Sequence, residues 1–278
     1  MDHGLIRAAF AAAQKVISER KVSMSITVET HVSDLPKAVV FGVGPVQGLG
    51  AGLSRRFAAE GRHVIVAGRT EAKIDRVRES IVEAGGSAST VVMDVTREAD
   101  VIRLFDVAMR ADGNGSSADL VAYNAGNNQP MDLRTMEADV FESFWRLNCF
   151  GGFLVGREAA RRFAPLGRGS ILFSGATGAL RGMPNFAHFA SSKAGLRMIA
   201  QSMAREFGPL GLHVAHVVID GGIDGERVHT RFAEHVKHKG DDGLLDIDAI
   251  ADAFWSLHRQ HRSAWTHELD LRPFKEAF

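Results

Sequence analysis

The chain has 278 residues, of which 45% are hydrophobic, and its 33 basic residues balance its 33 acidic residues. This neutral balance gives no electrostatic reason to expect a nucleic acid or an anionic membrane as a partner. No apolar run approaches the roughly 18 to 20 residues that span a bilayer. Cys149 is the only cysteine, which excludes an internal disulfide and favours a reducing compartment. The composition therefore predicts a globular cytoplasmic protein with no membrane and no nucleic-acid partner.

Residues 1–36 are predicted to be an N-terminal extension that precedes a domain at residues 37–278. Apolar side chains recur at helical spacing between residues 4 and 20, from Leu5 to Ile17. Two interpretations stay open: an amphipathic arm that packs on a partner subunit, and an extension with little function. The second is favoured because terminal segments are often dispensable.

The domain opens with an apolar run, Ala38–Phe41, which leads into the glycine-rich stretch 42–50 and then a helical pattern over residues 51–60. Strand, glycine turn and helix in this order predict a phosphate-binding unit. Glycines let the backbone approach a pyrophosphate, and the helix N-terminus faces the negative charge. The alternative is a purely structural tight turn. The residues concerned are Gly44, Gly48, Leu49 and Gly50.

A second strand, His63–Ala67, ends at Gly68 and Arg69, with no acidic residue before Glu71. A site for NAD(H) usually places Asp or Glu at this strand end to bind the ribose hydroxyl, whereas an arginine can pair with a 2′-phosphate. We therefore expect NADP(H) rather than NAD(H). The alternative is that Arg69 is simply solvated.

Strands and helices continue to alternate along the chain. Further apolar runs predict strands, and helical patterns separate them, with a polar turn at residues 112–117. The order predicts a single doubly wound Rossmann-type α/β domain with a parallel sheet. The predicted strands are 89–93, 120–122, 170–173 and 213–219, and the predicted helices are 71–83, 99–110, 141–163 and a helix ending at 207.

The stretch 174–193 reads SGATGALRGMPNFAHFASSK, and Lys193 follows Phe189 by four residues, which places both on one helix face. With the glycine turn, the triplet 124–126 (Asn-Ala-Gly) and Asn148, this stretch resembles the short-chain dehydrogenase/reductase family over residues 37–273. The resemblance implies an oxidoreductase that binds a nicotinamide dinucleotide and a small-molecule substrate. It also implies a homodimer or a homotetramer.

In the family, a serine and a Tyr-x-x-x-Lys helix carry out the acid–base chemistry. Lys193 matches the lysine, and Asn148 matches an asparagine that supports a proton-relay water. Phe189 stands where the family has its tyrosine, and Gly175 stands where it has its serine. A phenyl ring has no proton to give, so we do not expect carbonyl reduction by the family's usual route.

Other side chains could supply the missing group. The hydroxyls of Ser174 and Thr177 flank Gly175, and Ser192 could reach the same cleft. His188 is offset by about 100° from Phe189 around a helix, and we interpret it as a surface or interface histidine. Tyr123, the only tyrosine, lies in a strand-end motif and is a weak candidate for the acid.

The resemblance also assigns cofactor contacts. Asp94 would contact the adenine, Lys193 the ribose, and Ile223 the carboxamide, whereas Gly225 stands where a pyrophosphate-binding threonine is usual. The polar residues 226–247 stand at the family's substrate loop. The full set is Gly44, Gly48, Leu49, Gly50, Arg69, Asp94, Val95, Asn124, Ala125, Gly126, Lys193, Gly221 and Ile223.

Two histidine pairs at i,i+3 spacing, His235 with His238 and His258 with His261, are predicted to lie on solvated faces, and no metal is expected. Two functions remain open. The chain is an NADP(H)-dependent oxidoreductase with altered acid–base chemistry, or a catalytically inactive nucleotide-binding sensor or scaffold. Retention of Lys193 and Asn148 favours the first, and replacement of the tyrosine and the serine favours the second.

Overall fold

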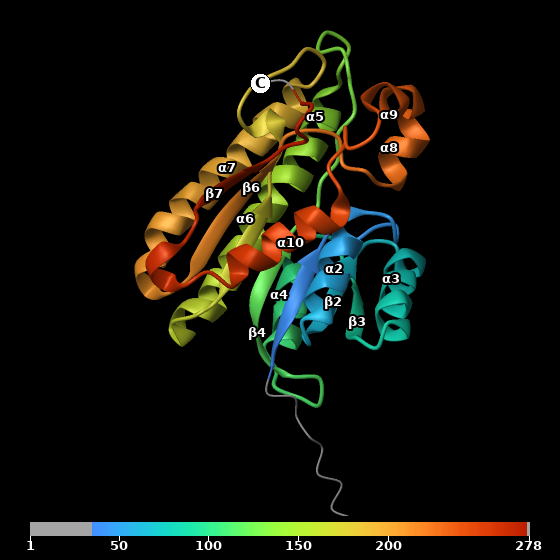
Figure 1. Cartoon of the computed structure of the whole chain (residues 1–278). Coiled ribbons are helices and arrows are strands. Elements are labelled where there is room, and N and C mark those ends of the chain that lie inside the picture. The colour runs from blue at the N-terminus through green and yellow to red at the C-terminus, as the bar shows by residue number, and fades with distance from the viewer. Residues whose placement is uncertain (1–34, 277–278) are drawn as a thin grey trace, which may run out of the picture. The chain divides into compact units, whose positions relative to one another are not determined.

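The computed structural model describes residues 35–276, and these residues form an α/β unit built on one sheet (Figure 1). Within this range seven strands lie in the order β3-β2-β1-β4-β5-β6-β7. Every pairing is parallel, so the carboxyl ends of the strands meet at one edge. This confirms the predicted doubly wound fold. The strands are β1 (Pro36–Phe41), β2 (His63–Gly68), β3 (Ser87–Val92), β4 (Ser116–Tyr123), β5 (Ser170–Ser174), β6 (His213–Ile219) and β7 (Glu268–Leu271).

Helices connect the parallel strands, as crossover connections require. The α-helices are α2 (Leu49–Ala59), α3 (Glu71–Glu83), α4 (Glu98–Ala108), α5 (Ala138–Trp145), α6 (Gly151–Phe163), α7 (Ala187–Phe207), α8 (Glu226–Arg231), α9 (Ala233–Lys239) and α10 (Ile247–His258). Short 3-10 turns are η2 (Ala164–Leu166), η3 (Thr177–Ala179), η4 (Gly208–Leu210) and η5 (Arg262–Ala264).

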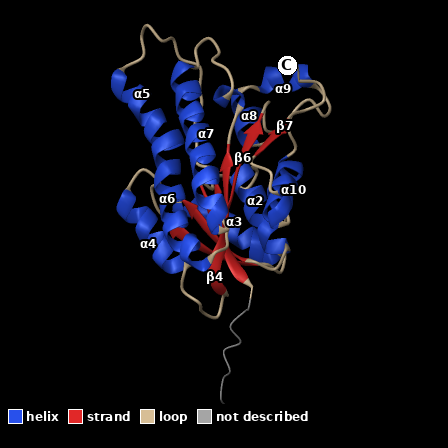
Figure 2. Cartoon of the chain, turned by 90° about the vertical axis from the view of Figure 1, so that its left-hand side faces the viewer, coloured by secondary structure: helices blue, strands red, loops and turns tan. Residues whose placement is uncertain are grey.

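The helices cover both faces of the sheet, because strands buried on both faces need apolar cover on each. One apolar cluster packs α4, α6 and α7 against the sheet, with Phe105, Leu154 and Leu196 among its buried members. A second cluster packs α2, α3 and α10 through residues such as Leu53 and Ile74. Figure 2 shows α4 and α6 on one side of the strands and α2 and α10 on the other.

The helical segment predicted at residues 141–163 has three parts. α5 continues into a π-helical turn, η1 (Arg146–Phe150), and this turn continues into α6. Asn148 is fully buried within the π-helical turn. Such turns are rare and often lie at functional sites.

The region between β6 and β7 contains more structure than the sequence analysis predicted. The polar residues 226–247 include α8 and α9, and α10 follows them. The Asp246 carboxylate caps α10 by accepting a hydrogen bond from the Ala249 N–H at 2.7 Å. α10 packs on α2, where a β-carbon at Gly52 would lie 2.2 Å from Ile247 Cγ2.

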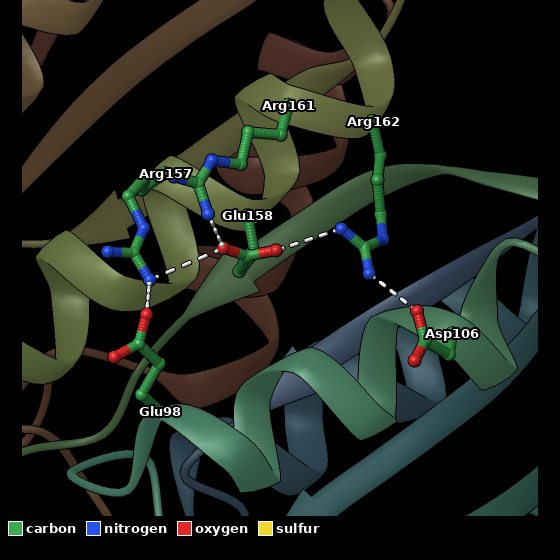
Figure 3. Close-up of polar contacts among 6 residues, drawn as sticks. All are labelled: Glu98, Asp106, Arg157, Glu158, Arg161 and Arg162. Carbon is green, nitrogen blue, oxygen red and sulfur yellow. Dashed lines mark hydrogen bonds and ion pairs between the residues drawn. The ribbon is translucent and has the colours of Figure 1, made fainter.

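A charge network joins α4 to α6 (Figure 3). The Glu158 carboxylate is 3% exposed and accepts hydrogen bonds from Arg161 and Arg162, each at 2.8 Å. Arg157 lies 3.3 Å from the same carboxylate and also binds Glu98, while Arg162 donates to Asp106 at 2.5 Å. The negative charge of Glu158 therefore reduces the repulsion among three guanidinium groups that lie close together on α6.

We expect Glu158→Gln to lower the free energy of unfolding by about 1–3 kcal/mol, because the arginines then repel one another around a buried neutral group. Chemical denaturation of the purified protein measures this change. Asp106→Asn is the matched control, since Asp106 is 54% exposed and binds Arg162 alone in this network. A Glu158→Gln protein as stable as the control would show that the network contributes nothing.

None of the helices among residues 35–276 is long and apolar enough to cross a membrane. The predicted extension at residues 1–36 lies outside the described residues except for its last two positions, and β1 begins at Pro36. The helix expected between residues 4 and 20 is also outside them.

Candidate functional site

The glycine-rich turn between β1 and α2 lies at the carboxyl edge of the sheet. A β-carbon at Gly50 would lie 3.0 Å from the Gly42 carbonyl oxygen, so the turn closes tightly only without a side chain there. Gly44 has no heavy atom within 4 Å of its β-carbon position. Gly48 caps α2 with no side-chain hydrogen bond, and the first turn of α2 contains no acidic residue. The N-terminus of α2 is therefore available to an anion.

The ends of β1 and β4 meet at the point where the strand order reverses. Gly42 has a φ of 78°, and its β-carbon would lie 2.3 Å from Ala125 Cα. The Asn124 amide donates to the Gly42 carbonyl at 3.3 Å. These contacts place Gly126 beside the glycine turn, in the crevice where open α/β sheets bind their ligands.

Asn148, Lys193 and Gly126 converge in this crevice. A β-carbon at Gly126 would lie 2.9 Å from Asn148 Oδ1 and 3.5 Å from Lys193 Nζ. The Asn148 side chain accepts from the Asn127 N–H at 3.2 Å and donates to the Asn127 carbonyl at 3.3 Å. The structure thus brings together the two polar residues that the sequence analysis placed in the catalytic set.

Close helix packing produces this convergence. A β-carbon at Gly195 of α7 would lie 2.7 Å from Cys149 Sγ in the π-helical turn, and one at Gly152 would lie 2.3 Å from Leu196 Cδ1. The glycines therefore let α7 approach η1 and α6 closely. Burial raises the pKa of the Cys149 thiol, in agreement with its interpretation as a small core residue.

Lys193 is 5% exposed as a residue, and its ammonium donates to the Ser174 carbonyl at 2.8 Å. Burial lowers its pKa from 10.5 to about 8. The ammonium thus lies at the end of β5, one residue before Gly175. The charge of the Lys193 side chain therefore changes as the pH passes through about 8.

Two other residues of α7 have contacts outside this group. Phe189 is half-buried, and its ring lies 3.0 Å from the β-carbon position of Gly178. The Ser192 hydroxyl donates to the Phe189 carbonyl at 2.9 Å, so its proton is engaged in a hydrogen bond to the backbone of α7.

The interpretation of His188 as a surface histidine is wrong. Its side chain is fully buried, with the ring edge-on to Phe144 at 4.5 Å and Nε2 3.1 Å from the Gln129 carbonyl. The face of α7 that carries His188 is covered by α5, which spacing along α7 alone could not predict. Burial lowers the pKa of His188, so it is a neutral internal residue.

The hydroxyls that flank Gly175 also have defined places. Thr177 donates to Asp220 at 2.5 Å, and Asp220 accepts from Arg272 at 2.7 Å. Ser174 Oγ is buried with no hydrogen-bond partner among residues 35–276. Thr177 therefore fixes the loop after β5 to the end of β6.

Gly175 itself faces a histidine that the sequence analysis did not single out. A β-carbon at Gly175 would lie 2.4 Å from both Cε1 and Nε2 of His216, a fully buried residue of β6. The signal in the sequence was a histidine with apolar residues on both sides of it in the strand. Its neighbour at position 175 could be recognised only once the strands were paired.

A cavity of about 280 Å³ lies between the ends of β2 and β3 and the π-helical turn. Arg69 and Asp94 line it together with Thr96, Phe144 and Leu147. The Asp94 carboxylate accepts from the N–H and the hydroxyl of Thr96, and Val95 beside it is buried. Arg69 is exposed.

The loop after β6 crosses the glycine turn. Glu226 N–H donates to the Gln47 carbonyl at 2.9 Å, and a β-carbon at Gly225 would lie 2.8 Å from the same oxygen. Gly225 therefore allows a backbone contact that a threonine would obstruct. Gly221, with φ of 149°, and Ile223, bridged to Leu245, lead the chain to this contact.

Two further expectations concern aromatic and histidine side chains. Tyr123 is fully buried, donates to the Leu147 carbonyl, and has its pKa raised by burial. Its hydroxyl is therefore not suited to act as the acid of the site. His235, His238 and His261 are exposed, as predicted. The prediction for His258 is wrong, because its ring is bonded to Ser170 and Arg62 and its pKa is lowered by burial to about 4. The described residues contain no group of three or more potential metal ligands.

Comparisons with known proteins bear on this arrangement. Residues 38–235 match the family model described as short chain dehydrogenase. The chain is 30% identical over 80% of its length to 3beta-hydroxysteroid dehydrogenase 1 of Eggerthella lenta, of which it covers 87%. It is 32% identical over 73% of its length to the uncharacterized oxidoreductase YuxG of Bacillus subtilis, but covers only 30% of that protein. A crystal structure of a short-chain dehydrogenase from Rhodopseudomonas palustris aligns with a TM-score of 0.69 and 35% identity, over 85% of this chain and 99% of that one.

Proposed function

The chain belongs to the short chain dehydrogenase family, and from this membership we propose that it is an NADP(H)-dependent oxidoreductase whose acid–base chemistry is altered. Its substrate is a small molecule, and the protein acts as a homodimer or a homotetramer. The observation that carries the proposal is the convergence of Lys193, Asn148 and Gly126 beside the glycine turn.

The residues of the crevice fit a dinucleotide. The uncapped N-terminus of α2, with Gly44, Gly48, Leu49 and Gly50, would receive the pyrophosphate, and Gly44 leaves open space where a side chain would stand. Asp94, Val95 and the triplet 124–126 would hold the adenosine half, with Arg69 at its 2′-phosphate. Lys193 would hold the nicotinamide ribose, and Gly221 and Ile223 the carboxamide. When bound, the nicotinamide supplies hydride transfer.

The altered chemistry follows from the residues at two positions. We propose that Phe189 occupies the place of the family's tyrosine and Gly175 that of its serine. Phe189 has no proton to exchange and Gly175 has no hydroxyl. Asn148 and Lys193 remain to order water and to orient the ribose.

The same two positions favour a second candidate, a nucleotide-binding sensor or scaffold without catalysis. In that case the crevice would bind a dinucleotide, and no carbonyl or alcohol would be converted. Turnover distinguishes the two functions, whereas binding alone does not.

Calorimetric titration of nucleotide-free protein with NADPH, and separately with NADH, tests the proposal. We expect saturable binding that is tighter for NADPH. Absence of binding to either dinucleotide would contradict both candidate functions.

Arg69→Ala tests the preference for the 2′-phosphate. We expect affinity for NADPH to fall about 10-fold, since a hydrogen bond to a charged group contributes about 1.5 kcal/mol, while affinity for NADH stays the same. Arg205→Ala is the control, because Arg205 is exposed in the last turn of α7 and binds only the Gln201 carbonyl. An equal loss of affinity for NADPH and NADH would show that Arg69 does not bind the 2′-phosphate.

A further inference from the structure

His216 lies where a side chain at Gly175 would extend. The residue is fully buried in β6, and its Cε1 and Nε2 atoms each lie 2.4 Å from the β-carbon position of Gly175. Two atoms cannot share this space, so no residue larger than glycine fits at position 175 unless the imidazole moves. The His216 imidazole thus occupies the space that the side chain of a serine at position 175 would need.

A carboxylate holds the other side of the ring. His216 Nδ1 lies 3.1 Å from Glu268 Oε2, and Glu268 accepts two hydrogen bonds from Arg197, at 2.6 and 2.7 Å. The Arg197 hydrogen bond lowers the pKa of Glu268, so this carboxylate is ionised and can only accept. The proton of the neutral imidazole must therefore be on Nδ1, and Nε2 carries the lone pair.

The free nitrogen lies beside Gly175, at the end of β5. His216 Nε2 is buried and has no hydrogen-bond partner among residues 35–276. Lys193 precedes Arg197 by one helical turn on the same face of α7, and its ammonium binds the carbonyl of Ser174, the residue before Gly175. Lys193, Gly175 and His216 thus meet at the end of β5. A buried acceptor without a partner is costly, and a bound hydroxyl group would satisfy it.

We propose that His216 is the general base of this site and takes the hydroxyl proton of a secondary alcohol, with Glu268 as its positioning residue. The inference rests on the proposed function. As the alcohol is oxidised, the C–H electron pair leaves as hydride to an oxidised nicotinamide dinucleotide and the C=O bond forms. The O–H proton moves to Nε2, the resulting imidazolium is stabilised by Glu268, and the proton is later released to solvent.

The charges around the imidazole favour this direction of reaction. The pKa of His216 is lowered to about 4, mainly by burial and also by the charges of Lys193 and Arg197 on α7, while Glu268 on β7 acts in the opposite direction. The imidazole is therefore neutral at neutral pH and ready to accept a proton. A weak base suffices, because a hydroxyl becomes strongly acidic as hydride departs. Carbonyl reduction would instead need the scarce protonated form.

His216→Asn tests the role, because asparagine can keep a hydrogen bond to Glu268 and lacks Nε2. The probes are NADP⁺ with cyclohexanol, menthol and a hydroxysteroid. We expect kcat to fall about 10²–10⁴-fold, as for loss of a general base, while KM and the affinity for NADP⁺ stay unchanged. His213→Asn is the matched control: it is a buried histidine of the same strand, bonded to the Thr266 carbonyl. We expect it to have the kcat of the unmodified protein.

A second measurement uses no substrate. Nitrogen NMR of the imidazoles in the dinucleotide-free protein, assigned by comparison with His216→Asn, should show His216 protonated at Nδ1 and bare at Nε2 across neutral pH. A proton on Nε2 would overturn the inference, and so would a His216→Asn protein with unchanged kcat. Failure of the unmodified protein to bind NADPH or NADP⁺ would contradict the proposed function, and the NMR result would then decide the state of His216 by itself.

Discussion

Phe189→Tyr is expected to create carbonyl reductase activity, or to raise it by about 10²–10⁴-fold, the range that a positioned general acid contributes. The new phenol would lie four residues before Lys193 on the same face of α7. Phe189 is half-buried, so a hydroxyl at the ring tip need not be enclosed without a partner. Consumption of NADPH with phenanthrenequinone, an activated carbonyl compound, measures the gain.

The control for this gain is Phe186→Tyr, which adds a phenol to the neighbouring ring, 6.4 Å from that of Phe189. It should leave the activity unchanged. Restoring a serine as well requires a second change, because Gly175→Ser conflicts with the His216 imidazole unless His216→Asn accompanies it. If Phe189→Tyr binds NADPH normally but reduces no carbonyl compound, Phe189 does not occupy the place of the acid.

Lys193→Ala is expected to weaken NADPH binding by about 10–100-fold, because hydrogen bonds from a charged group contribute about 1.5–3 kcal/mol. The same variant should lose little stability, since burial of the ammonium is itself unfavourable, as its lowered pKa indicates. Calorimetric titration with NADPH measures the affinity, and thermal unfolding measures the stability. Arg205→Ala again serves as the control.

The affinity of the unmodified protein should also depend on pH. The pKa of Lys193 is about 8, so the ammonium predominates below this pH and the neutral amine above it. Affinity for the anionic dinucleotide should therefore fall as pH rises through about 8, and this decrease should be absent in Lys193→Ala. An unchanged affinity in the variant would remove Lys193 from the cofactor site.

Most of the fold could be predicted from local patterns. The helix at residues 71–83 and the strand at residues 213–219 have the predicted boundaries, because five of the seven strand residues are apolar and the helix repeats its apolar positions at one period. Asn148 and Lys193, which the resemblance placed in the candidate site, lie close together in the structure, and their roles remain predictions. The local sequence is enough to predict an element when the spacing of apolar residues within that element identifies it as a helix or a strand.

Contacts between distant segments could not be predicted in this way. Gly175 and His216 lie on neighbouring strands, and their contact depends on how β5 and β6 are paired. The burial of His188 depends on α5, which packs against it. The π-helical turn around Asn148 is a local shift in hydrogen bonding, and it produces no periodic pattern of apolar residues in the sequence. The helix α10 had a signal, the capping residue Asp246, which the analysis of its polar surroundings did not use.

The burial of Tyr123 has a spectroscopic consequence. It is the only tyrosine of the chain, and its hydroxyl is enclosed and bound to the Leu147 carbonyl, with its pKa raised by burial. Ultraviolet absorbance of the folded protein therefore contains no tyrosinate contribution at moderately alkaline pH. In Phe189→Tyr, any such absorbance would come from the introduced phenol, so an optical titration would report the ionisation of that one group directly.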